Sequence, residues 1–246
     1  MSVELIPING LPDVLPGTDL SALFDDTPLA EGDILVLAQK IVSKAERRLV
    51  DLATVKPSAQ ARAVALRTEK DARLVHLIIQ ESNRIIRMRP GVLIVEDVRG
   101  WVCANAGIDR SNVPQGAQGE HVCLLPSDPD RSASDLRASL QTKRGVTVGV
   151  LIADSHGRAW REGTVGVAIG ASGLQALRDL RGASDRYGYQ LQHTLVATAD
   201  EIAAAASLLM GQSDEGVPAV LVRGLTAAGD GRARDLQRDL RRDLFR

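Results

Sequence analysis

The sequence predicts a mixed α+β fold in which strand and helix segments alternate without a regular βαβ winding. Strand-like and helix-like patterns interleave along all 246 residues, and the nearly continuous apolar run at 146–154 is typical of a strand buried on both faces. A chain of this length buries a substantial core in one large or two modest domains. Its 44% hydrophobic and 25% charged content excludes wholesale disorder.

The first third of the chain contains two predicted strands and a predicted helix. Residues 3–8 (VELIPI) alternate as a strand does, and they end in the breaker segment 9–17. Residues 32–39 form a short apolar run of strand length, and the segment KIVSKAERR follows it. We expect a polar helix at 57–70.

The middle of the chain predicts a helix and a hairpin. Residues 74–88 carry apolar groups at helical spacing, and the Pro-Gly pair that follows stops the helix. Residues 92–104 predict a β-hairpin that turns at its Arg-Gly pair.

The C-terminal third begins with the central strand at 146–154. The pattern GLQALRDL then predicts a short helix that ends at Gly182, and HTLVATA predicts another strand. Residues 200–210 predict a helix that opens with two acids, which suit the helix dipole, and that closes at Gly211. VPAVLVRGL predicts the last strand.

The tail at 230–246 is rich in charge and repeats leucine every fourth residue, at Leu236, Leu240 and Leu244. This spacing predicts a helical tail that lays one apolar stripe on the body of the protein or on a partner.

Composition narrows the classes of partner. Aromatic residues make up only 2% of the chain, which leaves few stacking platforms for single-stranded nucleic acid. The 30 basic and 31 acidic side chains give a net charge of −1, so no overall field selects DNA or an anionic membrane. The two cysteines form no CxxC, the N-terminus resembles no signal peptide, and no apolar stretch approaches the ~18 residues of a membrane span. We therefore expect a cytoplasmic protein with a small-molecule partner, and neither a nucleic acid nor a membrane.

Several common catalytic motifs are absent. The sequence contains no GxxxxGK[ST], no GxGxxG after a strand, no HExxH and no GxSxG, and its four histidines show no paired metal-ligand spacing. These absences argue against Rossmann, P-loop and familiar hydrolase sites.

Hard oxygen ligands follow two of the predicted strands. Asp154 and Ser155 come at the end of the central strand, and Asp109 follows the strand that ends at Ala104. Functional residues concentrate at such strand ends, and carboxylate and hydroxyl oxygens suit Mg²⁺ or Mn²⁺. The alternative is that both aspartates are ordinary turn or cap residues.

Basic side chains near these positions suit an anionic ligand. Lys40 and Lys44 lie four residues apart and could neutralise phosphate, although a solvated lysine pair is the ordinary alternative. Arg158 and Arg161 flank a tryptophan just after Asp154, and they could hold a phosphate or a carboxylate or form surface salt bridges. The loop MGQSDEGV follows a predicted helix and contains a glycine near each end. It could contribute to binding, or it could be a simple polar connection.

Eight segments occur in one order that resembles the coenzyme F420:L-glutamate ligase family. They are GLP, GDILVLAQKIVSKAE, NAGIDRSN, LLPSDPD, ADSHGRAWREGTVGVAIG, DRYGY, ADEIAAAASLLMGQ and VPAVLVRG. The resemblance runs from about residue 5 to about residue 225, and its two longest motifs, NAGID-x-SN and D-[ST]-x-G-R-x-[WF]-R-x-G, are unusual enough to be specific.

The resemblance implies a fold, an assembly and a reaction. Members of the family are intertwined homodimers of a mixed α/β fold, so we expect one unit over 1–246 with two interlocked α+β subdomains. The family uses GTP to add γ-linked glutamates to a deazaflavin coenzyme. The γ-phosphoryl group passes to the terminal carboxylate of the coenzyme precursor, and the amine of L-glutamate attacks the acyl phosphate. We expect the stand-alone form, without the reductase domain that some relatives carry.

The resemblance also implies the ligand sets. Asp109 and Asp154 would hold one Mg²⁺ or Mn²⁺ ion, Ser155 with Gln212 a second, and Lys44 would join the two aspartates in catalysis; a requirement for K⁺ is left open. Ser155 replaces a common Thr and keeps the hydroxyl, whereas Gln212 replaces a carboxylate found in some relatives. The expected contacts to GTP are Leu11, Pro12, Asp13, Val14, Gln39, Lys40, Lys44, Asn112, Met210, Gly211, Gln212, Ser213, Asp214, Glu215, Gly216 and Val217.

Two other functions fit the same residues. One is another metal-dependent phosphotransferase or acyl-phosphate enzyme, and the other is a nucleotide-binding module without turnover. The ligand set favours chemistry, because a sensor has no need for two metal ions at the γ-phosphate.

Overall fold

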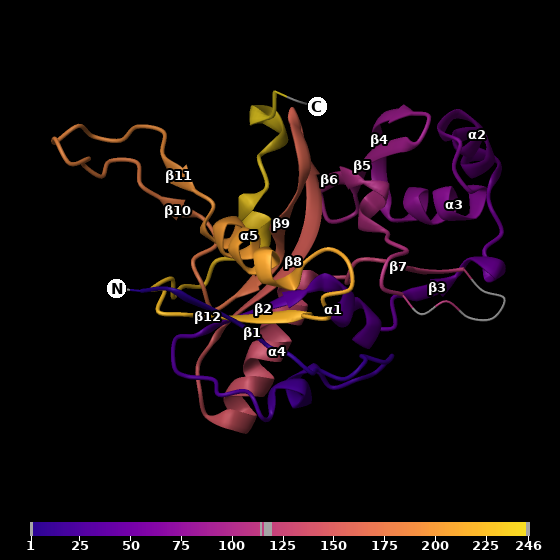
Figure 1. Cartoon of the computed structure of the whole chain (residues 1–246). Helices are drawn as coiled ribbons and strands as arrows, with labels where there is room; N and C mark the ends of the chain where they lie inside the picture. Colours follow the sequence, from indigo (N-terminus) through magenta and orange to yellow (C-terminus); the bar gives the residue numbers. More distant parts are fainter. Residues whose placement is uncertain (1, 114, 116–119, 245–246) are drawn as a thin grey trace.

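The computed structural model describes residues 2–113, 115 and 120–244. Its largest element is a five-stranded mixed sheet in the order β1-β12-β2-β8-β9 (Figure 1). These strands are β1 (Glu4–Pro7), β12 (Ala219–Arg223), β2 (Ile34–Ala38), β8 (Gly149–Arg158) and β9 (Arg161–Ser172). Strands β2 and β8 run parallel, and the other neighbours are antiparallel. The sheet therefore joins segments from both ends of the chain.

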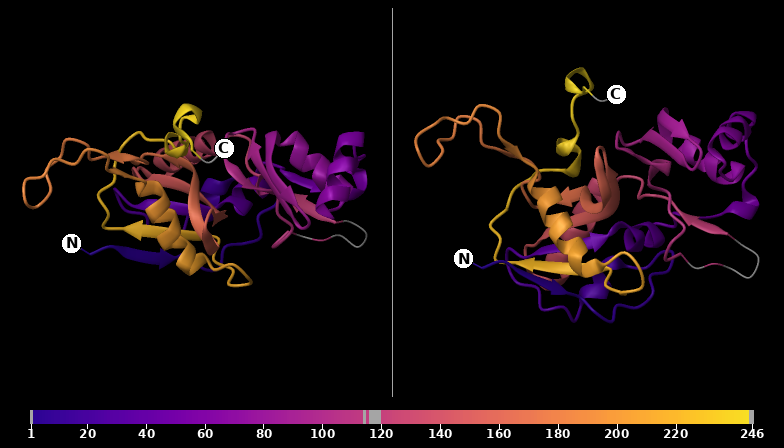
Figure 2. Two further views of the ribbon diagram at one scale, coloured as in Figure 1. Left: turned by 90° about the horizontal axis from the view of Figure 1, so that it is seen from above. Right: turned by 45° about the horizontal axis from the view of Figure 1, so that its top comes forward.

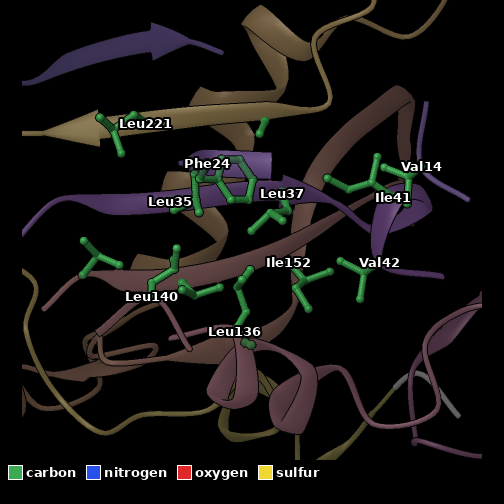
Figure 3. Close-up of a cluster of buried hydrophobic side chains, with 14 of the residues drawn as sticks. Val14, Phe24, Leu35, Leu37, Ile41, Val42, Leu136, Leu140, Ile152 and Leu221 are labelled. Carbon is green, nitrogen blue, oxygen red and sulfur yellow. The ribbon is translucent and has the colours of Figure 1, made fainter. Parts of the chain in front are cut away.

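Helices cover both faces of this sheet. The helices α1 (Gln39–Ala45) and α4 (Pro129–Arg144) cover one face, and α5 (Thr198–Met210) covers the other. Alternate residues of β2 divide between the two sides. Leu35 and Leu37 join the cluster that Figure 3 shows around Phe24, whereas Ile34 and Val36 pack towards α5. Because both faces are buried, the central strands need apolar residues at every position.

A second group of elements lies beside the sheet, in purple and magenta in Figure 2. It contains α2 (Ala59–Thr68), α3 (Ala72–Gln80), the sheet β4 (Ser82–Arg89), β5 (Val92–Asp97), β6 (Val102–Ala104), and the pair β3 (Leu49–Asp51) and β7 (His121–Cys123). The group has its own core of buried aliphatic side chains, among them Leu52, Ile78 and Leu93.

A hairpin arm and five short 3₁₀ segments complete the fold. The strands β10 (Arg178–Asp179) and β11 (Leu195–Val196) form the base of an arm that projects from the body (Figure 1). The 3₁₀ segments described by the structure are η1 (Leu20–Phe24), η2 (Leu52–Thr54), η3 (Asn105–Gly107), η4 (Ala233–Leu236) and η5 (Leu240–Arg242). No helix within residues 2–113, 115 and 120–244 has the length and apolar character needed to cross a membrane.

The structure confirms the α+β class and most of the predicted elements. Strands occur within 3–8, 32–39 and 217–225, a helix occurs within 57–70, α5 covers 200–210, and the 92–104 segment forms the β5–β6 hairpin. The central strand predicted at 146–154 is present but continues to Arg158, so that Asp154 and Ser155 lie within it and not beyond its end. The strand predicted from HTLVATA shortens to Leu195–Val196. Homodimerisation and two interlocked subdomains stay predictions.

The helix predicted at 74–88 is wrong in its second half. The helix α3 ends at Gln80, and after Glu81 the eight residues Ser82–Arg89 form β4, which pairs with β5. Ile85 lies opposite Val95, and Met88 lies opposite Leu93. The apolar spacing of this segment is compatible with a helix and with a bulged strand. The strand forms because its side chains pair with those of β5.

Two further helix predictions are wrong. The segment GLQALRDL is extended, with Leu174 and Ala176 buried and Gln175 exposed between them, the alternation expected of a strand. The tail forms only the short 3₁₀ segments η4 and η5 in place of one helix. Asp130 fixes the start of η4, since its carboxylate accepts hydrogen bonds from the backbone N–H groups of Ala233 and Arg234.

Candidate functional site

A cavity of about 700 Å³ opens where the sheet meets the second group of elements. Five parts of the chain form most of its wall: the loop 11–14, the start of α1, the end of β6 with the turn after it, the second half of β8, and the loop that leaves α5. The sheet holds these parts in register because β2 and β8 are parallel neighbours, with Ala38 opposite Ala153. Both strands therefore deliver their following residues to the same edge.

This cavity gathers most of the residues that the sequence singled out. The lining residues among them are Leu11, Pro12, Asp13, Val14, Gln39, Lys40, Lys44, Asp109, Asn112, Asp154, Ser155, Met210, Gly211, Gln212, Ser213, Asp214, Gly216 and Val217. Three predicted residues do not line it, namely Glu215, Arg158 and Arg161. The structure thus brings the two aspartates, two lysines and the α5–β12 loop into one place.

Asp109 lies in a turn built on unusual backbone. Asn105, Ala106 and Gly107 all have positive φ, with values of 54°, 55° and 69°, just before it. Left-handed backbone at two non-glycine residues costs free energy and is found mainly where surrounding structure requires it. Asp109 then forms a two-way backbone bridge with Cys123, whose N–H donates to the Asp109 carbonyl at 2.8 Å. The turn holds the carboxylate at the cavity.

The Asp109 carboxylate is paired with a lysine. Lys40 Nζ lies 2.7 Å from Asp109 Oδ2 and also donates to Ser111 Oγ at 2.6 Å. The Ser111 backbone N–H donates to Asp109 Oδ1 at 2.9 Å. Burial by itself would raise the pKa of Asp109, but the hydrogen bonds from Lys40 and Ser111 hold it below its usual value. Asp109 is therefore a carboxylate with a cation already beside it.

Asp154 has a different partner. Its Oδ2 lies 3.0 Å from His156 Nε2, and both side chains are largely buried. Residues two apart on a strand point to the same side, so the strand itself aligns the pair. The spacing of the four histidines does not reveal this role of His156; its position two residues after Asp154 is the sequence signal for the contact.

Two hydrogen bonds tie the α5–β12 loop to these acids. Ser155 Oγ donates to Gln212 Oε1 at 2.8 Å, and Asn112 Nδ2 donates to the carbonyl oxygen of Ser213 at 2.9 Å. The loop turns at Gly211, where φ is 68° and any Cβ would collide with the carboxylate of Glu215. Only glycine fits there.

Glu215 folds back onto its own loop. The Ser213 N–H donates to its Oε2 at 2.8 Å, and the N–H groups of Glu215 itself, Ser213 and Gln212 lower its pKa. Converging backbone N–H groups of this kind form an anion-binding arrangement, and here a carboxylate occupies it. Glu215 thus has a hydrogen-bonding role within the loop, and its contact with GTP stays a prediction.

The cavity wall also carries Cys103. Burial raises its pKa to about 12, and the charges of Asp97 and Asp154 add to the effect. The thiol stays protonated near neutral pH, so it cannot serve as a thiolate nucleophile there.

The oxygen ligands of this cavity fit a divalent metal bound together with phosphate. Within the described part of the chain, no three His, Cys, Asp or Glu side chains gather closely enough to hold a metal ion. The cavity does contain two carboxylates, a serine hydroxyl and an amide oxygen, from Asp109, Asp154, Ser155 and Gln212. Mg²⁺ in particular is commonly held by one or two carboxylates while substrate phosphates and water complete its shell. The donor set therefore suits a metal that arrives with a nucleotide.

Comparison with known proteins identifies the relatives of this chain. The model of the family F420-0:gamma-glutamyl ligase matches residues 10–224. The chain is 47% identical over its whole length to the coenzyme F420:L-glutamate ligase of Methanopyrus kandleri, covering 98% of that protein. It is 45% and 42% identical over its whole length to the proteins of the same name from Methanothermobacter thermautotrophicus and Archaeoglobus fulgidus, covering 100% and 97% of them.

Proposed function

Since the chain belongs to the F420-0:gamma-glutamyl ligase family and is a ligase, we propose that it joins L-glutamate through γ-linkages to the precursor of coenzyme F420, with GTP as the phosphoryl donor. The observation that supports GTP and metal use is the cavity itself, in which Asp109 and Asp154 lie with Lys40 and Lys44.

The reaction is a carboxylate activation followed by amide formation. The terminal carboxylate of the coenzyme precursor attacks the γ-phosphorus of GTP; the bond from that phosphorus to the bridging oxygen breaks, and GDP leaves. The amine of L-glutamate then attacks the carbonyl carbon of the acyl phosphate, inorganic phosphate leaves, and the amine gives up a proton. The products are the amide, GDP and phosphate.

The residues of the cavity have separate tasks in this scheme. Lys40 and Lys44 offset the negative charge of the triphosphate and of the approaching carboxylate. Asp109 and Asp154, with Ser155 and Gln212, would hold the divalent ions. Such ions, when bound, reduce the repulsion between anionic nucleophile and phosphate. His156 holds the Asp154 carboxylate in one orientation through the 3.0 Å contact.

The loop after α5 closes the nucleotide side of the cavity. Its contact with Asn112 links the loop to the turn that carries Asp109, so binding of a nucleotide by the loop also orders that turn. Closure of this kind excludes water, which would otherwise hydrolyse the acyl phosphate.

One incubation tests the proposal. The protein is mixed with GTP, Mn²⁺ or Mg²⁺, coenzyme precursor and L-glutamate, and the products are analysed by mass spectrometry. The proposal expects a product heavier by one glutamate residue together with GDP. GDP without a change in coenzyme mass would identify a phosphotransferase or hydrolase, and neither product would identify a nucleotide-binding module. Omission of L-glutamate is the control.

A further inference from the structure

The cavity wall contains a buried hydrogen-bond acceptor without a partner. The side chain of Asn105 lines the cavity at the start of η3 and is partly buried. Its Oδ1 is closed off from solvent and accepts no hydrogen bond from residues 2–113, 115 and 120–244. Burial of an unsatisfied acceptor costs stability, so native proteins retain one where it has another use.

The left-handed backbone at this position does not account for the side chain. Asparagine adopts a positive φ more readily than most residues, and Asn105 has φ = 54°. In turns, however, asparagine and aspartate usually accept a hydrogen bond from a nearby backbone N–H. Asp97 does so from Arg99, and Asp109 does so from Ser111. Asn105 Oδ1 accepts no such bond in the described part of the chain.

The turn fixes the place of the Asn105 amide. The next residue, Ala106, is fully buried and also has a positive φ. Gly107 packs so closely on the core that a Cβ would lie 2.6 Å from Leu125 Cδ1. The N–H of Ile108 donates to the Asn105 carbonyl oxygen at 3.0 Å. The backbone is therefore held in place, while rotation about the Cβ–Cγ bond of Asn105 can turn Oδ1 toward the cavity.

The amide lies on the acidic side of the cavity. Asn105 directly follows β6, and β6 packs against β8, which carries Asp154. The charge of Asp154 contributes to the raised pKa of Cys103, which shows that the end of β6 lies close to this carboxylate. In the proposed function Asp154 holds a metal ion at the γ-phosphate, so Asn105 lies beside the place of reaction.

The chemistry of the amide oxygen selects one of the three substrates. An amide oxygen only accepts hydrogen bonds, so its partner carries an N–H or O–H group. A second unpartnered atom of the cavity wall, Gln39 Nε2, is a donor and suits the oxygens of GTP instead. The N–H groups of guanine and of the deazaflavin ring lie far from the reacting ends of their molecules. The amine of L-glutamate is the N–H group that has to reach the reacting carbon.

We propose that Asn105 Oδ1 accepts a hydrogen bond from the amine of the incoming L-glutamate and directs the nitrogen lone pair at the carbonyl carbon of the acyl phosphate. This inference rests on the proposed function for the reaction. In this step the C–N bond forms, the bond from the carbonyl carbon to the phosphate oxygen breaks, and its electron pair leaves with phosphate. The amine loses its proton to solvent. Asn105 takes no proton, because a carboxamide is not a base at neutral pH; its contribution is orientation.

Two variants separate the amide from the backbone. Asn105→Gly removes the amide and adopts the positive φ without strain, so its melting temperature should stay close to that of wild type. Its kcat/KM for L-glutamate should fall by roughly 10- to 150-fold, as expected for a lost hydrogen bond to a charged or reacting group, while the KM for GTP stays unchanged. Asn105→Asp keeps an oxygen acceptor and should lose less. Asn9→Gly, at an exposed asparagine outside the cavity lining, is the matched control.

Trapping of the intermediate shows which step is affected. Hydroxylamine at a saturating concentration replaces L-glutamate and converts the acyl phosphate to a hydroxamate, which mass spectrometry detects. Hydroxylamine has none of the groups that position an amino acid. Asn105→Gly should therefore form hydroxamate and GDP at the wild-type rate although it adds glutamate slowly.

The possible results separate the inference from the function on which it rests. If wild type adds glutamate and Asn105→Gly has an unchanged kcat/KM for L-glutamate, the inference is overturned and the function stands. Equal losses of hydroxamate and of glutamate addition in Asn105→Gly also overturn it, because they place Asn105 in the first half of the reaction. If wild type adds glutamate but yields no hydroxamate, the kcat/KM comparison decides. Wild type that adds no glutamate to the precursor removes the proposed function and the inference with it.

Discussion

Lys40 Nζ lies 2.7 Å from Asp109 Oδ2 and joins the first turn of α1 to the turn that follows η3. The ammonium group neutralises a partly buried carboxylate whose other hydrogen bonds come from the neutral groups of Ser111. If Asp109 holds a metal ion and Lys40 a nucleotide phosphate, as the proposed function requires, ligand binding would exchange one ion pair for two new contacts. The contact therefore describes the site before its substrates arrive.

The first prediction concerns the pKa of Asp109. Its folded pKa lies below the usual value, so the pair stabilises the fold above the unfolded pKa and loses this effect as pH falls through the folded pKa. Lys40→Met leaves burial uncompensated, and the pKa of Asp109 should rise. Carbon-detected NMR titration of the carboxyl measures it directly. Lys40→Arg keeps the charge and is the control; an equal pKa in Lys40→Met and wild type would contradict the pairing.

Thermal unfolding against pH gives an independent check. The difference in melting temperature between wild type and Lys40→Met should be largest near neutral pH. It should shrink below about pH 4, where the unfolded chain binds the proton as well.

The main architecture was predictable because the central strands obey simple patterns. β2 and the first half of β8, residues 149–153, are apolar, as burial on two faces demands, and the β5–β6 hairpin contains an Arg-Gly turn. The helix α4 was not predicted, although Asp128 caps its start and Gly145 ends it. Its surface is strongly charged, and its apolar residues Ala133, Leu136 and Leu140 are few. Because α4 has so narrow an apolar face, its sequence does not show the helical periodicity of apolar residues clearly.

The sequence indicates which single residues are candidates for the site, but it does not indicate which of them contact each other. Asp109 follows β6 as predicted, whereas Asp154 lies within β8, at the point where its buried apolar run ends, and these positions alone mark both as candidates. The pairing of Lys40 with Asp109 joins segments far apart in the sequence, so only the tertiary fold reveals it. Likewise, the sequence does not reveal that the carboxylate of Glu215 accepts a hydrogen bond from the backbone N–H of Ser213 within its own loop.

The second prediction is that Lys44→Ala impairs GTP use more than folding. Lys44 lines the cavity and is only partly buried, so its removal should change the free energy of unfolding by no more than about 0.5 kcal/mol. The KM for GTP should rise about tenfold or more, because a charged contact to phosphate is lost. Lys56→Ala, at an exposed lysine outside the cavity lining, is the control. A large fall in melting temperature at constant KM would show that Lys44 is structural.

The third prediction is a homodimer in solution. Tyr187 and Leu195 on the projecting arm and Leu240 and Leu244 in the tail are exposed apolar side chains that a second copy could cover. Light scattering at micromolar concentration should give about twice the chain mass of 26.3 kDa. A mass near that of one chain would contradict the prediction.

The fourth prediction is that Asp154→Asn folds normally but loses ligation. Asparagine is nearly isosteric with aspartate and can still accept the hydrogen bond from His156, so the end of β8 should keep its packing. The amide lacks the negative charge that a hard divalent ion requires. If the ion contributes several kcal/mol to the transition state, the rate should fall by roughly a hundred- to ten-thousand-fold. Mutant and wild-type melting curves and glutamate addition are compared at one metal concentration.

If Asp154 and Asp109 hold the same metal ion, the effects of substituting them should not add. Asp109→Asn should lose activity to a similar degree, and the double variant should be scarcely worse than either single one, because both carboxylates serve one ion. Two independent turn residues would behave differently, since turn and cap aspartates tolerate asparagine well and each substitution would leave near-normal turnover. Asp179→Asn is the control: it removes a carboxylate charge, together with the ion pair to Arg181, at an exposed position on the arm outside the cavity lining. Turnover close to wild type in Asp154→Asn would exclude Asp154 as a metal ligand and leave it a structural partner of His156.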